Sequence, residues 1–167
     1  MVPVLAESIH TVLGRAPDDD EVCREIARLL PTFLAQVHLL PEPVRRPDPA
    51  SYRRSLLHED PNGKFSIGCF VWSPGQRTPI HDHAGWGVVG VAFGALRETS
   101  YRLEQGRPIV SGSSRIDRGD CVWCPPAQDG IHQIGAEGNE VAVSIHVYGA
   151  PFASVCGTLY SLTETPS

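Results

Sequence analysis

The sequence lacks the features that mark several large classes of protein. Acidic residues outnumber lysine and arginine by 19 to 14, so the net charge is −5 and there is no basic surface for nucleic acid. No apolar run approaches the ~20 residues that a membrane-spanning helix needs, and the first residues do not resemble a signal peptide. The five cysteines are odd in number and irregularly spaced, which is a poor framework for disulfides. We therefore expect a cytoplasmic protein without nucleic-acid or membrane partners.

Glycine and proline, in contrast, are in excess. The 16 glycines and 15 prolines make up about 19% of the 167 residues, against roughly 12% in average proteins. This excess indicates many turns between short strands and argues against a helical bundle or coiled coil. The length suggests a single domain over residues 1–167.

Residues 1–40 have a helical pattern. Apolar side chains recur at helical spacing over residues 4–13. The acidic run at residues 18–21 then predicts the start of a second helix, because carboxylates favour the positive end of a helix dipole. Pro31 is expected to kink or divide that second helix. We expect a small helical cap, joined by a proline-rich connector over residues 41–50 to the rest of the chain.

From residue 51 onward the pattern is that of short strands separated by turns. Turn sequences such as Glu104-Gln105-Gly106 recur at a spacing of about ten residues, which is typical of an antiparallel barrel or sandwich. We expect a mainly β fold, with a β-barrel over residues 51–160. The expected strands cover residues 65–72, 87–93, 98–103, 113–116, 120–124, 130–134 and 140–148.

Two of the seven histidines, His81 and His83, form an H-x-H pair. On a strand both imidazoles point to the same face, so both can bind one metal ion. An H-x-H pair alone is more often two exposed histidines in a loop, but here Gly75 and Gly94 flank the pair and His132 follows in Gly-Ile-His. Three neutral imidazoles would leave a divalent ion with its full charge and with open positions, which suits a catalytic site.

The order of these residues resembles the two motifs of the cupin superfamily. The first motif, G-x5-H-x-H…G, covers residues 75–94, and the second, G-x5-P…H, covers residues 119–132. The resemblance implies a double-stranded β-helix, or jelly-roll, barrel. Typical cupins have a glutamate ligand a few residues after H-x-H, and Gly87 takes that position here. The resemblance therefore implies a site of three histidines without a carboxylate.

Within the cupins, such a site resembles that of the cysteine dioxygenase family. Further motifs match that family in order between Tyr52 and Cys156: Y-x-R, N-G-K-F, I-H-D-H, G-x-x-x-E, G-I-H and S-x-H-x-Y. The resemblance implies oxidation of a thiol to a sulfinic acid by both atoms of O2, with one Fe²⁺ per chain. The residues implied are the ligands His81, His83 and His132, the relay Ser144, His146 and Tyr148, and the substrate-binding residues Arg54 and Tyr52.

The spacing of the relay and substrate-binding residues fits these roles. The relay residues alternate along an expected strand and so face one way; without the metal motifs they would be read as a polar stripe on an exposed face. The resemblance implies that the serine fixes the tautomer of the histidine and that the histidine orients the tyrosine. Tyr52 and Arg54 share a face if their segment is extended, whereas Arg53 points away, and a guanidinium matches a carboxylate.

Two positions bear on the substrate and on the relay tyrosine. Relatives that prefer 3-mercaptopropionate carry glutamine at the place of Arg54, so Arg54 favours L-cysteine. Mammalian members carry a cysteine at the place of Gly87 that is crosslinked to the tyrosine, so we expect Tyr148 to be unmodified.

Other residues are interpreted as structural. Cys121 and Cys124 form a C-x-x-C, but on a strand their sulfurs would point to opposite faces, so we predict no zinc or redox site there. Cys156 resembles a family position near the substrate channel and receives no role. Asp82 is expected to face away from the metal. Trp72 either lines the pocket or packs, and packing is the more common role of an aromatic residue in a strand.

The residues and the resemblance together predict a non-haem iron thiol dioxygenase that converts L-cysteine to L-cysteine sulfinate. Its partners would be the small thiol and O2, and it would act as a monomer or weak homo-oligomer. Three alternatives stay open. They are a 3-mercaptopropionate dioxygenase with the same chemistry, a cupin isomerase that uses zinc or manganese, and a non-catalytic ligand-binding cupin.

Overall fold

In the computed structural model, which describes residues 1–16, 18–124 and 130–162, helices come first and strands follow. The helices are α1 (Val2–Leu13), α2 (Asp19–Leu34) and the short α3 (Glu42–Arg45), with a 3-10 turn at Val37–Leu39. None of the helices in the described residues is long and apolar enough to cross a membrane. The strands are β1 (Arg53–Glu59), β2 (Ser66–Trp72), β3 (Ile80–His83), β4 (Gly87–Phe93), β5 (Leu96–Glu104), β6 (Arg107–Ile116), β7 (Cys121–Cys124), β8 (His132–Ala136), β9 (Ala142–Tyr148) and β10 (Cys156–Tyr160), with a second 3-10 turn at Phe152–Ser154.

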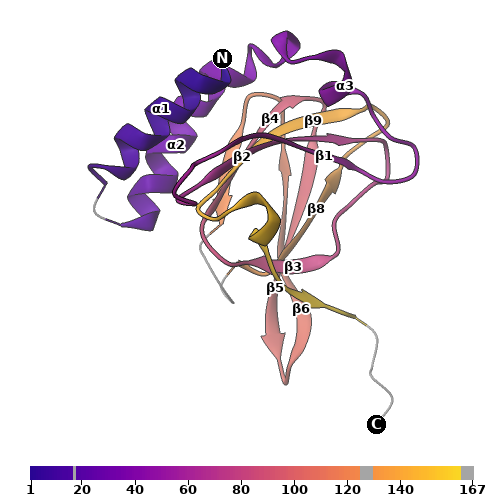
Figure 1. Ribbon diagram of the computed structural model, residues 1–167. Helices are drawn as coiled ribbons and strands as arrows, with labels where there is room; N and C mark the ends of the chain where they lie inside the picture. The colour runs from indigo at the N-terminus through magenta and orange to yellow at the C-terminus, as the bar shows by residue number, and fades with distance from the viewer. Residues whose placement is uncertain (17, 125–129, 163–167) are drawn as a thin grey trace.

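The strands form two five-stranded sheets that make up the walls of a barrel (Figure 1). The order is β1-β2-β9-β4-β7 in the first sheet and β10-β3-β8-β5-β6 in the second. All of these pairs are antiparallel, and strands far apart in sequence, such as β2 and β9, lie side by side. The predicted class, a mainly β barrel with an N-terminal helical part, is confirmed.

The first sheet is covered on both faces, and this decides where the site lies. Every residue of β2 and β9 is buried. Along these strands, side chains such as Cys69 and Val147 pack with the helices, whereas Phe70, Trp72 and Tyr148 pack inside the barrel. The helices therefore seal the outer face of this sheet, and the inner face is free to carry functional side chains.

The helical cap begins and packs as its sequence indicates. The side chain of Asp18 caps α2 by accepting a hydrogen bond from the Glu21 N–H at 2.9 Å. α2 lies directly on β4, where a Cβ added at Gly90 would be 2.7 Å from Leu30 Cδ2. Pro31 was expected to kink or divide this helix; the division is wrong, and the kink stays a prediction. α2 continues through it to its end at Leu34, because the side chains around it are held in the core against the sheet.

The structure also contains elements that the sequence did not predict. β1, β3 and β10 are strands outside the expected strand ranges, and α3 lies inside the proline-rich connector. β5 and β6 form one long hairpin that projects from the barrel (Figure 1), and β6 begins well before residue 113. The hairpin turn at Gln105 and Gly106 is as predicted, with φ values of 50° and 79°. The proline of the G-x5-P motif, at position 125, lies outside the described residues.

Candidate metal centre

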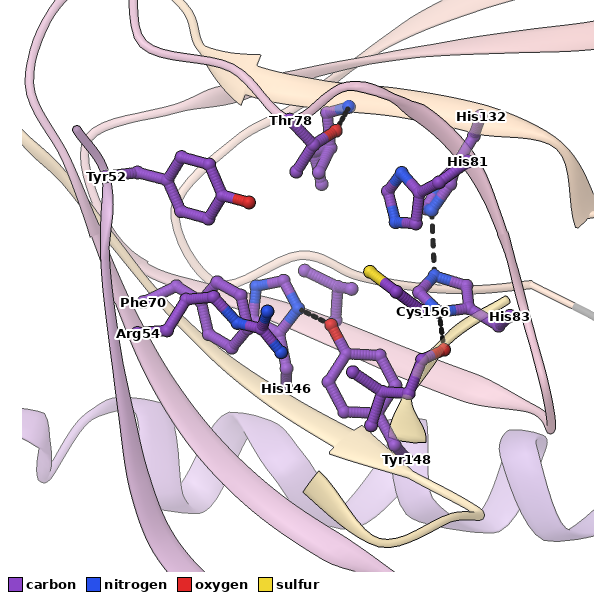
Figure 2. A pocket seen from close by; sticks show the side chains of 13 residues that line it. Tyr52, Arg54, Phe70, Thr78, His81, His83, His132, His146, Tyr148 and Cys156 are labelled. Carbon is purple, nitrogen blue, oxygen red and sulfur yellow. Dashed lines mark hydrogen bonds between the residues drawn. The ribbon is translucent and has the colours of Figure 1, made fainter. Parts of the chain in front are cut away.

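Three histidines from two neighbouring strands meet inside the barrel (Figure 2). His81 and His83 point to the same face of β3, and His81 is the register partner of His132 on β8. Their ligand atoms all lie within 4.8 Å of one another, and each residue is at most 4% exposed. In the described part of the chain, no other group of three or more His, Cys, Asp or Glu side chains could hold a metal ion.

Each of these histidines has an oxygen acceptor for its Nδ1 atom. An oxygen of a carbonyl or carboxylate accepts a hydrogen bond, so Nδ1 carries the imidazole proton and Nε2 has the free lone pair. The acceptors are the Pro79 carbonyl for His81 at 3.0 Å, the Val155 carbonyl for His83 at 3.0 Å, and the Glu98 carboxylate for His132 at 2.6 Å.

The free Nε2 lone pairs converge in a geometry that fits a cation. The Nε2 atoms of His83 and His132 are 2.9 Å apart. Two lone pairs at this distance repel each other, but ligand atoms bound to one ion at 2.0–2.1 Å lie about 3 Å apart. Imidazole nitrogen suits iron, zinc, copper and nickel, so the donor set is that of a transition-metal site.

The electrostatics keep two of the imidazoles, those of His81 and His83, neutral and able to bind a metal. Burial, together with the charge that His132 would carry, lowers the pKa of His81 to about 4. The same two causes lower the pKa of His83 to about 3. These two imidazoles are therefore unprotonated at Nε2 at neutral pH, without competition from a proton.

No carboxylate takes the position of a fourth ligand at residue 87. Gly87 faces the barrel interior, where an added Cβ would be 3.2 Å from the Cδ1 atom of Tyr148 and 3.3 Å from Cys124 Sγ. Among the described residues, the carboxylate that reaches a ligand histidine is that of Glu98, and it does so through His132 Nδ1. Position 87 also has no side-chain sulfur with which Tyr148 could be crosslinked.

The three relay residues of β9 form a continuous chain of hydrogen bonds. Ser144 Oγ lies 2.8 Å from His146 Nε2, and His146 Nδ1 lies 2.7 Å from the Tyr148 hydroxyl. Burial lowers the pKa of His146 well below its usual value and raises that of Tyr148 well above its own. Phe70 stacks on His146 with ring centroids 3.9 Å apart, and Trp72 Nε1 donates to Ser144 Oγ at 3.0 Å.

Arg54 and Tyr52 lie on the side of the pocket opposite the histidines (Figure 2). Tyr52 stacks on Trp72 with centroids 4.6 Å apart, and the Arg54 guanidinium lies over the rings of Phe70 and Phe152 at 5.4 and 5.0 Å. No carboxylate of the described residues forms an ion pair with Arg54, whereas the neighbouring Arg53 is 3.8 Å from Asp48. The pocket therefore contains an uncompensated cation.

One pocket joins these groups. Its described lining contains all the predicted ligand and substrate-binding residues, along with His146 and Tyr148 of the relay, whereas Ser144 lies behind His146. Cys156, for which no role is predicted, is exposed and lies at the same pocket.

The residues interpreted as structural also have defined positions. Asp82 faces away from the histidine cluster and accepts hydrogen bonds from the Thr158 N–H and the Tyr160 hydroxyl, both on β10. Cys121 packs against the helices, whereas Cys124 Sγ lies beside Gly87 inside the barrel. Burial raises the pKa of these two thiols to about 11 and about 12, so neither is a thiolate at neutral pH.

Sequence reasoning missed two residues that contact the site. Glu98 occurs in the G-x-x-x-E motif. Nothing in the sequence indicates that it contacts His132, which lies 34 residues further along the chain. For Trp72 the sequence left pocket lining and packing open, and it did not indicate that the indole N–H ends the relay chain. In both cases the partner lies on another strand, so only the pairing of strands could reveal the contact.

The architecture and the three histidines define a metal-binding cupin barrel. Solved structures of the same fold include a protein with a double-stranded β-helix domain from Klebsiella pneumoniae, with a TM-score of 0.55, 20% identity and coverage of 72% of this chain and 94% of that one. They also include a cupin-like protein from Thermotoga maritima, with a TM-score of 0.51, 23% identity and coverage of 70% and 85%. These similarities confirm the predicted cupin fold.

The sequence comparisons define the family within this fold. The family model described as cysteine dioxygenase type I matches residues 44–159, and the chain belongs to this family. A cysteine dioxygenase type 1 from Danio rerio is 31% identical over 114 residues, which cover 64% of this chain. The matched region spans 55% of the length of that relative.

Proposed function

We propose that this protein is a non-haem iron thiol dioxygenase that converts L-cysteine and O2 to L-cysteine sulfinate. The observation that carries the proposal is one pocket with three converging imidazoles on one side and, among the described residues, an unpaired guanidinium on the other. Membership of the cysteine dioxygenase type I family supports the same reaction. Both oxygen atoms of O2 are added to the sulfur, so the thiol becomes a sulfinic acid and no further oxidant or reductant is consumed.

His81, His83 and His132 would hold one Fe²⁺ per chain. When bound, the ion supplies the Lewis acidity that favours thiolate over thiol and the redox chemistry that O2 requires. The three ligands are neutral, so they leave the full charge of the metal in the pocket. Among the described residues, the carboxylate in contact with this set is that of Glu98, which acts through an imidazole, so its negative charge is kept away from the substrate.

The remaining groups bind and orient the substrate. Arg54 would bind the substrate carboxylate with its planar pair of N–H groups, and the rings of Phe70 and Phe152 hold the guanidinium in place. Tyr52 would cover the same side of the pocket. Tyr148 would donate a hydrogen bond to the bound reactants, because burial keeps its hydroxyl protonated.

A second substrate, 3-mercaptopropionate, is favoured by one observation. None of the described residues that line the pocket is acidic, so no side chain there would pair with the ammonium group of L-cysteine. A thiol acid without an amine would therefore lose no ion pair with these side chains. The ratio of kcat/KM for the two thiols decides between them, and a strong preference for 3-mercaptopropionate would overturn the choice of L-cysteine.

The decisive experiment is anaerobic loading with Fe²⁺ followed by O2 uptake with a panel of small thiols and detection of sulfinate by mass. We expect uptake with L-cysteine, sulfinate as product and loss of both in His132→Ala. Unchanged activity of His132→Ala would contradict the metal site. Zinc in protein purified without added metal, together with no thiol-dependent O2 uptake, would instead favour a cupin of another class.

The sequence also leads to proposals about the domain, the partners and the location of the protein. We propose that residues 1–167 act as a single cupin domain, which the shared core of the helices and the first sheet supports. The small thiol and O2 are its proposed partners. The cytoplasmic location and the monomeric or weakly oligomeric state stay predictions from the sequence.

A further inference from the structure

The relay of β9 has a fourth member at its buried end. Trp72 of β2 donates its indole N–H to Ser144 Oγ at 3.0 Å, and both side chains are fully buried. The chain of contacts then runs from Ser144 to His146 and on to the Tyr148 hydroxyl at the pocket. The four groups are hydrogen bonded in a line, so the direction of each bond depends on its neighbours.

The indole fixes the first direction, because an indole nitrogen can donate a hydrogen bond and cannot accept one. The Ser144 hydroxyl therefore accepts from Trp72 and must donate its own proton elsewhere. Among the described residues, the other polar partner of Ser144 Oγ is His146 Nε2 at 2.8 Å. A hydroxyl proton without an acceptor is costly in a buried position, so Ser144 donates to Nε2.

The second direction follows from the state of the imidazole. Burial lowers the pKa of His146 well below its usual value, so the ring is neutral and carries one proton. Because Nε2 accepts from Ser144, that proton is on Nδ1. Nδ1 then donates to the Tyr148 oxygen at 2.7 Å.

We propose that Trp72 is a positioning residue that sets the direction of this hydrogen-bond chain, so that Tyr148 presents its hydroxyl proton to the metal pocket. In the opposite direction, Tyr148 would donate to His146 and offer only lone pairs to the pocket. His146 Nε2 would then donate to Ser144, whose own proton would face an indole that cannot accept it. The use of the Tyr148 proton in catalysis rests on the proposed function, whereas the direction of the chain does not.

The tautomer of His146 tests the direction without any activity measurement. Imidazole ¹⁵N resonances distinguish a protonated ring nitrogen from an unprotonated one and can be measured on the apo protein and on the protein loaded with diamagnetic Zn²⁺. We expect His146 to be protonated at Nδ1 in both forms. Protonation at Nε2 in the wild-type protein would overturn the proposal.

Variants test the part played by Trp72. In Trp72→Phe the donor is gone and the Ser144 hydroxyl can turn into the space of the lost indole nitrogen, so the two His146 ¹⁵N resonances should shift toward each other as the tautomers mix. Trp86→Phe removes an indole from the core cluster of the helices and should leave these resonances unchanged. Wild-type resonances in folded Trp72→Phe would refute the role of Trp72.

Ser144→Ala keeps the proposal testable if Trp72→Phe does not fold. This variant removes both the acceptor of Trp72 and the donor to Nε2, so His146 should lose its single tautomer; resonances like those of the wild type would overturn the proposal. With Fe²⁺ and L-cysteine, Trp72→Phe should lower kcat more than it raises KM, because Arg54 and the ligand histidines are unchanged. If the tautomer is as expected and the wild-type protein does not oxidise thiols, the hydrogen-bond direction stands and the proposed function falls.

Discussion

The imidazole of His132 differs from those of His81 and His83 in the partner of its Nδ1 atom. The other two donate to neutral backbone carbonyls, whereas His132 donates to the Glu98 carboxylate at 2.6 Å. An anionic acceptor makes an imidazole a more basic ligand and holds its ring in one orientation. The Glu98 carboxylate thus acts on the site through a histidine.

Glu98→Gln should weaken metal binding while it preserves the shape of the side chain. We expect a loss of about 10- to 100-fold in Fe²⁺ affinity, the usual effect of removing a partner of a ligand histidine. Competition with a chromophoric chelator under anaerobic conditions measures it. Glu104→Gln, at the exposed end of the same strand, is the matched control and should bind Fe²⁺ as the wild-type protein does. Equal affinities for the two variants would show that Glu98 does not support the site.

Arg54→Gln should reduce the use of L-cysteine, because its carboxylate would lose the guanidinium that binds it. Loss of a charge-assisted hydrogen bond costs about 1.5–3 kcal/mol, so kcat/KM for L-cysteine should fall by about ten-fold or more. Cysteamine, which has no carboxylate, should be affected little. Arg53→Gln is the control, because Arg53 pairs with Asp48. An equal loss in the two variants would exclude a specific carboxylate contact at Arg54.

At the scale of elements, β10 connects the end of the described chain to the metal centre. It pairs with β3, and the Val155 carbonyl just before it accepts the hydrogen bond from His83. Asp82 of β3 holds β10 in place through the Thr158 N–H and the Tyr160 hydroxyl. The residue between the two ligand histidines therefore fixes the strand that in turn orients one of them.

Asp82→Ala should loosen β10. Loss of two hydrogen bonds to a buried carboxylate should destabilise the strand by about 1–3 kcal/mol and speed amide hydrogen exchange in residues 155–160. Mass spectrometry of the corresponding peptide measures this exchange. Tyr160→Phe removes one of the two bonds and should give a smaller increase. Exchange like that of the wild type in Asp82→Ala would contradict the anchoring role.

The sequence predicted the elements whose patterns are local and missed those that depend on pairing. α2 was visible in its acidic start and its apolar face, and β9 in its alternation. β10 is short and largely exposed and is held by contacts to Asp82, 76 and 78 residues away. Most of β6 is likewise exposed, with a serine- and glycine-rich end, and it is a strand because it forms a hairpin with β5.

At the scale of the whole molecule, Asp60 joins the helical cap to the barrel. Its side chain is buried, accepts hydrogen bonds from the N–H groups of Asn62 and Lys64 at 3.0 Å, and lies 3.1 Å from His10 of α1. The Lys64 and Asn62 N–H groups and the charge of His10 lower the pKa of Asp60. The ionised carboxylate is therefore favoured in the folded state.

The stability of the protein should fall in acid because of this group. A carboxyl whose pKa is lowered by folding contributes stability above its unfolded pKa, about 3.9, and loses that contribution as the pH falls through its folded pKa. Asp60→Asn should be less stable than the wild-type protein at pH 7, and the difference should shrink below about pH 4. Urea unfolding at a series of pH values measures it. Asp117→Asn, at an exposed ion pair with Arg115, should change little, and a constant difference for Asp60→Asn across the pH series would contradict the linkage.

Metal binding should stabilise the whole fold. The ligands come from β3 and β8, which are brought together only in the folded state. At a free metal concentration 100-fold above Kd, the gain is about 2.7 kcal/mol, which should raise the thermal midpoint. Scans with and without Zn²⁺ or anaerobic Fe²⁺ measure it. His132→Ala should show no rise, and a rise equal to that of the wild-type protein would place the metal elsewhere.

The amino-acid sequence was sufficient for the relations that repeat along one strand. A period of two places His81 with His83, and Ser144 with His146 and Tyr148, on one face wherever the strand lies. The barrel class and the helical cap also followed from local patterns of turns and apolar residues. The contacts of His132 with Glu98, and of Trp72 with Ser144, join residues 34 and 72 positions apart and arose only from the tertiary structure. The physical reason is that the local backbone determines the face of the strand to which a side chain points. The residue that it contacts depends on which strands pair and in which register.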